Sequence, residues 1–363
     1  MQVSGFESSI KRRASEADAG SRMKKIKRGY IFPSAAFTVP RNRIRSFIQS
    51  DKKPAVGDLI YGTIAQVVQH VSLENKEGRI HSMNEGTRAI FVLGNRYAPD
   101  YYEGVVPDEM PQYLDLLARS GVVGVVKNKN SMIKDPTKVK VSGYICDADG
   151  KVLNTRDFNL ITPKSDKKIP NRARMILIIG TSMNCGKSVT AAACCWALST
   201  MGHTVRGAKV TGTASLKDIL LMEDSGASPV ADFSFMGYPS TYLLDLPELL
   251  RIFNTLDLKY ANSPKNYWVV ELADGVLQRE TAMLLRSKDV LSRVYKIIFN
   301  AADAFSAIGG LDVLKKEFDL VPDAISGICA GSPLAVQELR DYTDLPIFNS
   351  VQRNLNELAS IIL

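Results

Sequence analysis

The chain has 363 residues, which is long enough for two domains of ordinary size. Hydrophobic residues make up 45% and charged residues 23% of the sequence, and this composition excludes a wholly disordered or fibrous protein. No apolar run approaches the roughly 18 residues that a membrane helix needs, and the first residues lack the apolar core of a secretory signal. The cysteines number five, an odd count that argues against a disulfide framework and favours a reducing compartment. We therefore expect a soluble, cytoplasmic protein.

Residues 1–53 carry the excess positive charge. They contain 13 Lys/Arg and 4 Asp/Glu, a net charge of +9, whereas the rest of the chain has a net charge of −1. Because much of this segment lacks apolar periodicity, we predict a disordered basic leader. Such an arm fits contact with nucleic acid or with an acidic partner; the alternative is a solvated tail.

Residues 54–162 consist of short strand-like runs separated by turn residues. The runs do not alternate regularly with helices, although residues 110–120 suggest one short helix and residues 147–150 a hairpin turn. The pattern predicts a β-rich domain: a small barrel, a sandwich or an α+β module. The hydrophilic residues 163–171 form a predicted linker to the next domain.

In residues 172–363, strands and helices alternate. The predicted strands are residues 174–180, 204–210, 267–272, 294–299, 324–330 and 345–349. The predicted helices are residues 188–202, 280–288, 309–318, 332–342 and 351–363. This rhythm predicts an α/β fold, in which helices cover both faces of a mainly parallel sheet.

Residues 180–188, with the sequence GTSMNCGKS, lie between a predicted strand and a predicted helix. Glycines let the main chain approach a polyphosphate, and N–H groups at the start of a helix attract anions. In such a loop Lys187 reaches the β- and γ-phosphates, and the Ser188 hydroxyl ligates Mg²⁺. Five residues, not the more common four, separate the two glycines. The predicted nucleotide contacts are Gly180, Thr181, Ser182, Met183, Asn184, Cys185, Gly186, Lys187, Ser188 and Val189.

Charged residues follow later strands at the carboxyl edge of the predicted sheet, where α/β proteins bind ligands. Glu271 and Asp274 follow one strand, and a carboxylate there can hold Mg²⁺; capping of the next helix is the alternative. Lys209 ends another strand and can clamp a γ-phosphate or a substrate carboxylate. A further metal ligand is expected among three later aspartates, of which we select the last: Asp218, Asp224 and Asp232.

Two asparagines also end predicted strands. Asn300 and Asn349 are candidates for contact with a nucleotide base or ribose, and turn formation is the alternative for each. The tyrosine-rich residues 93–107 of the β-rich domain are either a binding loop or an ordinary aromatic turn. Cys194 and Cys195 fit small core positions better than a redox pair.

The loop GTSMNCGKS resembles the phosphate loop of dethiobiotin synthetase, which also places five residues before Gly-Lys-Thr. GAKVTGTAS puts Lys209 where that family has a lysine, and YWVVELADG puts Glu271 and Asp274 at its metal-binding segment. The segment KVTGTAS…DFSFMG is similar to an uncharacterised P-loop family related to that enzyme, and its Asp-Phe pair contains Asp232. The resemblance covers about residues 175–363. It implies a P-loop domain that binds ATP and Mg²⁺, with Lys187, Lys209 and Glu271 as catalytic residues and Ser188, Asp232 and Glu271 at the metal.

The resemblance implies an ATP-dependent ligase or kinase-like enzyme that phosphorylates an oxygen nucleophile on an unidentified acceptor. ATP is favoured because the sequence has no guanine-specific Asn-Lys-x-Asp motif. One alternative is a regulatory ATPase that controls a partner protein or a nucleic acid through its N-terminal domain. Another is a nucleic-acid-binding module with a degenerate nucleotide site. Relatives with sites across two subunits imply a homodimer.

Overall fold

The structure is a computed structural model that describes residues 23–161 and 172–363. The chain divides into two compact units. The N-terminal unit comprises Met1–Asn95 and Tyr102–Phe158, and the C-terminal unit comprises Arg96–Tyr101 and Asn159–Leu363. The predicted linker, residues 163–171, and residues 1–22 of the predicted leader lie outside the described residues.

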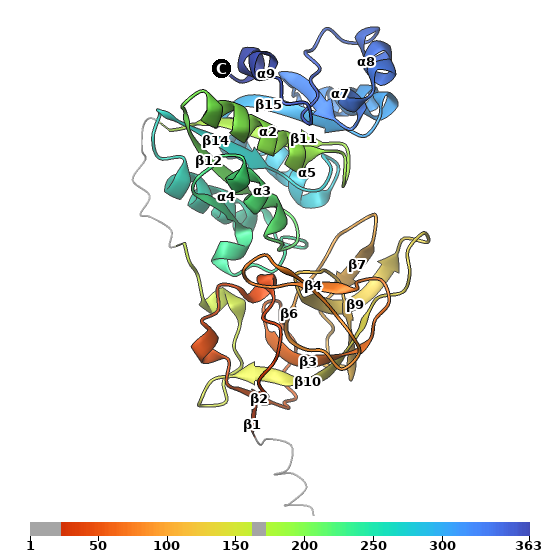
Figure 1. Ribbon diagram of the computed structural model, residues 1–363, viewed down its shortest axis with the longest axis vertical. Helices are drawn as coiled ribbons and strands as arrows, with labels where there is room; N and C mark the ends of the chain where they lie inside the picture. Colours follow the sequence, from red (N-terminus) through yellow and green to blue (C-terminus); the bar gives the residue numbers. More distant parts are fainter. Residues whose placement is uncertain (1–22, 162–171) are drawn as a thin grey trace, which may run out of the picture. The chain divides into compact units, whose positions relative to one another are not determined.

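Five strands of the N-terminal unit close into a barrel (Figure 1). They are β3 (Leu59–Gln66), β6 (Arg88–Leu93), β8 (Tyr113–Leu116), β9 (Val122–Lys129) and β10 (Lys138–Cys146). The order around the barrel is β10–β3–β6–β9–β8, and β8 pairs again with β10. All pairs are antiparallel except β6–β9. Alternate side chains point inward and fill the barrel, among them Ile60, Phe91, Leu116 and Val139. The prediction of a β-rich domain is confirmed.

Shorter elements surround the barrel. The strands are β1 (Lys24–Lys25), β2 (Ser46–Ile48), β4 (Ser72–Glu74), β5 (Ile80–Ser82) and β7 (Tyr102–Val105). The 3₁₀ turns are η1 (Ser34–Ala36), η2 (Arg41–Arg43) and η3 (Thr155–Asp157). Strand β2 pairs with β10, and β1 pairs with β2.

Two sequence-based predictions for this unit are wrong in part. Residues 31–48 were expected in a disordered leader, but Phe32, Val39 and Ile44 are buried, and the N–H of Ile31 donates to the main-chain oxygen of Arg88 in β6. Residues 110–120 contain β8 and not a helix. The LDLL pattern fits one helical face, but pairing with both β9 and β10 satisfies the main chain as a strand.

The C-terminal unit contains a six-stranded sheet (Figure 1). Its strands, in spatial order, are β13 (Val230–Asp232), β12 (Thr204–Lys209), β14 (Asn266–Glu271), β11 (Arg174–Gly180), β15 (Val294–Ala301) and β16 (Ala324–Gly327). All neighbouring pairs are parallel. The predicted α/β domain with a mainly parallel sheet is therefore confirmed. Residues 345–349 form no strand; Ile347 makes an isolated bridge to β16.

Helices lie on both faces of this sheet. They are α2 (Lys187–Thr200), α3 (Lys217–Asp224), α4 (Leu246–Tyr260), α5 (Arg279–Leu285), α6 (Lys288–Leu291), α7 (Ala304–Phe318), α8 (Pro333–Arg340) and α9 (Leu355–Ile362), with the 3₁₀ turns η4 (Phe233–Met236) and η5 (Cys329–Gly331). Successive residues of β14 point to opposite faces. Val269 packs in the cluster that contains α2, whereas Trp268 contacts Phe253 of α4 on the other face.

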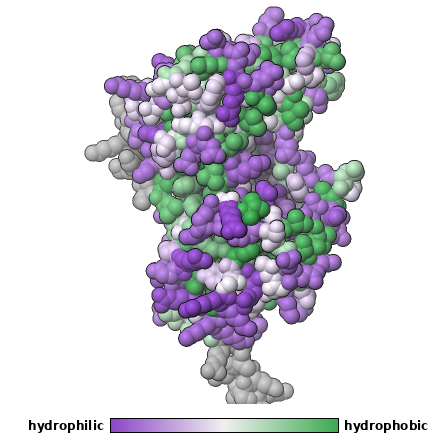
Figure 2. Space-filling view, in the orientation of Figure 1, coloured by the Kyte–Doolittle hydropathy of each residue, from purple (hydrophilic) through white to green (hydrophobic). Residues whose placement is uncertain are grey.

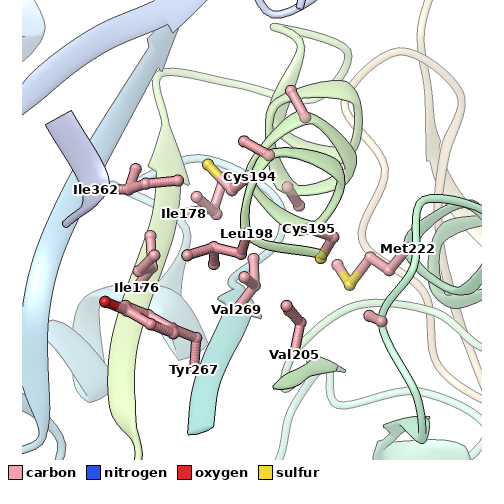
Figure 3. Packing of buried hydrophobic residues seen from close by; sticks show 14 of the residues in the cluster. Ile176, Ile178, Cys194, Cys195, Leu198, Val205, Met222, Tyr267, Val269 and Ile362 are labelled. Carbon is pink, nitrogen blue, oxygen red and sulfur yellow. The ribbon is translucent and has the colours of Figure 1, made fainter. Parts of the chain in front are cut away.

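Helix α2 packs against the centre of the sheet (Figure 3). Leu198 and the free cysteines Cys194 and Cys195 lie among Ile178 and Val269 of the strands, with no exposed surface. The many small side chains of α2 let the helix pack closely against the strands, and this packing holds the helix in position. The cysteines are core residues, as the sequence predicts.

Hydrophilic side chains cover most of the face shown in Figure 2, and apolar residues occur there in small groups. Among the described residues, no helix is long and apolar enough to cross a membrane.

Candidate functional site

Three charged side chains meet because their strands are in register. Lys209 of β12 is paired with Asp232 of β13 on one side and with Glu271 of β14 on the other. Val269 lies two residues before Glu271, Val230 two before Asp232 and Val205 four before Lys209, and all three valines pack in the cluster with α2. Since side chains alternate along a strand, the three charged side chains point to the α2 side of the sheet at its carboxyl edge.

The loop at residues 180–188 connects β11, in the interior of the sheet, with α2. Gly186 has a φ of 110°, and a Cβ there would lie 2.8 Å from Cα of Gly327, so the loop requires glycine at this position. Within the described part of the chain, the main-chain N–H groups of residues 182–186 donate to no protein acceptor. The loop thus presents a row of N–H donors at the start of a helix, which is an anion-binding arrangement.

Lys187 lies inside this loop. Its Nζ donates to the main-chain oxygen of Ser182 at 2.7 Å and lies 3.7 Å from Sγ of Cys185. The lysine is 5% exposed, so its charge belongs to the loop and not to the surface. A phosphate bound by the loop N–H groups would therefore lie next to the Lys187 ammonium group.

Ser188 and Glu271 form the link between the loop and the sheet. Oγ of Ser188 donates to Oε1 of Glu271 at 3.2 Å. Nζ of Lys209 lies 3.7 Å from the same Oε1 and forms an ion pair with Asp218 at the start of α3. The four side chains therefore form one connected polar cluster at the carboxyl edge.

Burial and charge act against each other in this cluster. Burial raises the pKa of Glu271, and the nearby Lys209 and Lys187 offset this only in part. Burial also favours the neutral forms of Lys209 and Asp218, but their ion pair outweighs it, so the pKa of Lys209 is raised and that of Asp218 is lowered. Lys209 and Asp218 are therefore held as an ion pair. The positive charge near the buried Glu271 is too small to offset the effect of burial on its pKa.

The residues present fit a magnesium ion. Oε2 of Glu271 is buried and has no hydrogen-bond partner among the described residues. A hydroxyl and one carboxylate are typical protein ligands for Mg²⁺, which takes its other ligands from water and phosphate. The described residues contain no group of three or more His, Cys, Asp or Glu side chains that would form an all-protein metal site.

Two predicted carboxylates lie beside the cluster. Asp232 is 1% exposed, and its Oδ1 accepts hydrogen bonds from the N–H and the hydroxyl of Ser234, so it caps η4. Burial raises the pKa of Asp232 to about 6. Burial also raises the pKa of Asp274, against the opposing charges of Lys187, Lys209 and Arg96. Asp224, at the end of α3, is exposed and has no place in the cluster.

The two asparagines predicted to contact a base or ribose both form hydrogen bonds within the protein. Asn300 has no exposed surface: its side chain donates to the main-chain oxygen of Ile179 at 2.9 Å and accepts from Thr190 at 2.6 Å. It ties β15 to β11 and α2, and no nucleotide base can reach it. Oδ1 of Asn349 accepts from the N–H of Val351 at 2.9 Å, which is the alternative role of turn former.

Sequence reasoning did not identify two contacts of the site. Asp218 was one of three aspartates, and only the position of α3 shows that it pairs with Lys209. In the segment Arg96–Tyr101, which belongs to the C-terminal unit, Asp100 accepts a hydrogen bond of 2.5 Å from Asn184 of the loop. The tyrosine-rich sequence around Asp100 was the signal available for this contact.

No family model matches the chain, and no curated protein matches it. Distant likenesses occur among the solved structures, and three of them follow. The signal recognition particle receptor FtsY from Elizabethkingia anophelis is 12% identical, with 57% of this chain and 71% of that one covered, at a TM-score of 0.36. A ParA family ATPase from Chlorobium tepidum is 16% identical, with 52% and 90% covered, at 0.32. HypB from Helicobacter pylori, in complex with nickel, is 13% identical, with 52% and 83% covered, at 0.33. Likeness at this level assigns no activity to the chain.

Proposed function

We propose that the C-terminal unit binds ATP with Mg²⁺ at residues 180–188 and transfers its terminal phosphoryl group to an acceptor. The observation that carries the proposal is the buried Glu271 carboxylate, which shares one oxygen with Ser188 and has a second oxygen without a partner among the described residues. It lies next to a loop of free N–H donors that contains Lys187. This combination brings together donors for phosphate and ligands for a metal.

Each residue has a role that follows from its position. The loop N–H groups and Lys187 bind the phosphates and neutralise part of their charge. Ser188 and Glu271 would hold Mg²⁺, which supplies further neutralisation of phosphate charge when bound. Asp218 fixes the Lys209 ammonium, so that this positive charge is already oriented at the carboxyl edge.

The resemblance to dethiobiotin synthetase favours a ligase-type reaction, in which an oxygen nucleophile of the acceptor takes the phosphoryl group. A small cleft beside Asp274, with a volume of only about 10 Å³ in this structure, is where we place the approach of such an acceptor. It is lined largely by hydroxyl and amide side chains: Tyr97, Thr213, Ser240, Thr241, Tyr242 and Gln278. These groups would bind a small polar molecule by hydrogen bonds.

The proposal is tested by changing Lys187 and Glu271 separately. In Lys187→Ala the affinity for Mg-ATP should fall on the order of 10²-fold, because a buried charge facing the phosphates is lost. In Glu271→Gln the nucleotide should still bind within a few-fold, while phosphate release falls on the order of 10²-fold. Calorimetric titration and a phosphate-release assay measure the two effects.

Lys259→Ala, which removes an exposed lysine on α4, is the matched control and should change neither quantity. Unchanged affinity in folded Lys187→Ala would reject the phosphate loop. Full turnover in Glu271→Gln, with a lowered melting temperature, would reduce Glu271 to a structural residue. ATP binding without turnover in the wild-type chain would instead identify a nucleotide-controlled switch.

A further inference from the structure

A dense group of positive charges lies on the N-terminal unit. Between Asp18 and Asp51 the sequence contains eight Lys/Arg and no carboxylate. Seven of the eight are in the described part of the chain, and all seven are exposed: Lys24, Lys25, Lys27, Arg28, Arg41, Arg43 and Arg45. We call these seven side chains the basic face.

Strand pairing brings the two halves of the basic face together. Lys24 and Lys25 of β1 pair with Phe47 and Ser46 of β2, and the N–H of Ile26 donates to the main-chain oxygen of Arg45 at 2.9 Å. The first group of cations therefore runs antiparallel to the second group. A disordered leader would not hold the two groups at a fixed separation.

No carboxylate neutralises these charges within the described residues. None of the seven side chains forms an ion pair there, although elsewhere in the same unit lysines pair with aspartates, as Lys138 does with Asp115. Figure 2 shows hydrophilic side chains where Figure 1 places β1 and β2. Seven like charges on two paired segments, with no carboxylate among them, favour a polyanionic ligand.

An aromatic ring lies within this group of charges. Phe47 is the cross-strand partner of Lys24, is half-buried, and lies with its ring centroid 5.2 Å from that of Tyr61 of β3. Cations that follow a phosphate backbone, next to an aromatic ring that stacks on a base, are the combination by which proteins bind single-stranded nucleic acid. A five-stranded barrel is also a scaffold that presents such surfaces.

We propose that the basic face binds single-stranded nucleic acid, with the lysines and arginines on the phosphates and Phe47 on a base. The contacts to phosphate carry no sequence information, so the binding is not sequence-specific. This inference is independent of the nucleotide site in the C-terminal unit. It assigns a ligand class to the N-terminal unit.

The test is the binding of a fluorescein-labelled 20-nucleotide single strand, as DNA and as RNA, measured by fluorescence anisotropy with the full chain at several salt concentrations. Two variants each remove three charges: Lys24, Lys25 and Lys27 to Gln, and Arg41, Arg43 and Arg45 to Gln. Each should weaken binding at least tenfold at low salt. The slope of log K against log salt should become shallower by about 2, since each lost phosphate contact on a single strand contributes about 0.7.

The matched control replaces Lys288, Lys315 and Lys316 by Gln, which removes the same number of exposed charges from the C-terminal unit. It should bind the oligonucleotide like the wild type. Phe47→Leu keeps an apolar side chain but removes the ring, and should weaken binding several-fold at an unchanged salt slope. Circular dichroism confirms that each variant is folded.

Three outcomes would overturn the proposal. The first is no oligonucleotide binding by the wild-type chain at low salt, as expected if the basic face binds an acidic protein. The second is an equal loss of affinity in the control and in the two charge variants, which would reflect net charge alone. The third is unchanged affinity in Phe47→Leu, which would exclude stacking and hence the single-strand preference.

Discussion

Asp232 shows how burial controls the charge of a single residue. Its carboxyl group is buried in register with Lys209, and burial raises its pKa to about 6 from an ordinary value near 3.8. The folded state therefore binds this proton more tightly than the unfolded state does. The stability that the protonated form contributes is complete below about pH 4 and is lost as the pH rises through about 6.

We expect Asp232→Asn to remove this pH dependence. The amide keeps Oδ1 as the acceptor for Ser234 but carries no charge. The free energy of unfolding of the variant, relative to the wild type, should rise between pH 4 and 8 on the order of 2–3 kcal/mol. Both tryptophans of the chain, Trp196 and Trp268, lie in the C-terminal unit, so their fluorescence during urea unfolding without metal reports on this unit.

Asp224→Asn is the control for this experiment, because Asp224 is an exposed aspartate in the same unit. Its stability relative to the wild type should stay constant over the same pH range. A difference for Asp232→Asn that does not grow with pH would show that Asp232 is ionised in the folded protein throughout. A carboxylate that stays charged without metal would also strengthen the sequence-based assignment of Asp232 as a metal ligand.

At the scale of the element, α2 connects the core with the phosphate loop. Leu198 has no exposed surface and packs near the C-terminal end of the helix, about 16 Å along its axis from Lys187. We expect Leu198→Ala to lower the free energy of unfolding of the C-terminal unit by about 2–5 kcal/mol, through the cavity it leaves. ATP affinity below the melting temperature should change little, because the loop end of α2 keeps its contacts.

Thr200→Ala, at an exposed position of the same helix, controls for the loss of side-chain atoms without a cavity. Urea unfolding followed by tryptophan fluorescence and a titration with ATP measure the two quantities. Equal stability of both variants would mean that α2 is not packed as described. A large loss of affinity in Leu198→Ala would show that the loop geometry depends on the whole helix.

The elements that sequence predicts well are those whose pattern is local. Strands such as β11 and β15 are apolar runs, and the loop before α2 has its own glycine signature. Strand β13 has only three residues, and α3 and α4 were missed although α4 has an amphipathic pattern. For the site, the rule that strand ends share one edge brought Lys209 and Glu271 together. The pairing with Asp218 and the burial of Asn300 depend on tertiary packing, which the sequence does not show.

At the scale of the whole molecule, the chain joins two units that each have their own core. The residues that carry the nucleotide site lie in the C-terminal unit, and the basic face lies in the N-terminal unit. One segment departs from this division: Arg96–Tyr101 lies in the sequence between strands of the barrel but belongs to the C-terminal unit. Its hydrogen bond from Asn184 to Asp100 is exposed, and such bonds contribute only about 0.5–1.5 kcal/mol.

Removal of residues 1–48 tests how far the two units are independent. The deletion takes away β1, β2 and the buried side chains Phe32 and Val39, so the barrel loses part of its cover. We expect the N-terminal unit to become sensitive to limited proteolysis. The affinity for ATP should stay within about tenfold of the wild type, since the deletion removes no described residue of the C-terminal unit and leaves Asp100 in the chain.

Phe32→Ala in the full chain is the comparison, because it removes one buried side chain and keeps the chain length. It should destabilise the N-terminal unit less than the deletion does, with unchanged ATP affinity. Calorimetric titration measures the affinity for ATP, and the rate of proteolytic cleavage within residues 49–158 measures the stability of the barrel. If the deletion abolished ATP binding while tryptophan fluorescence showed a folded C-terminal unit, the nucleotide site would depend on the barrel. The segment Arg96–Tyr101 would then be a necessary part of the site, because it is the stretch of the C-terminal unit that lies in the sequence between β6 and β7 of the N-terminal unit.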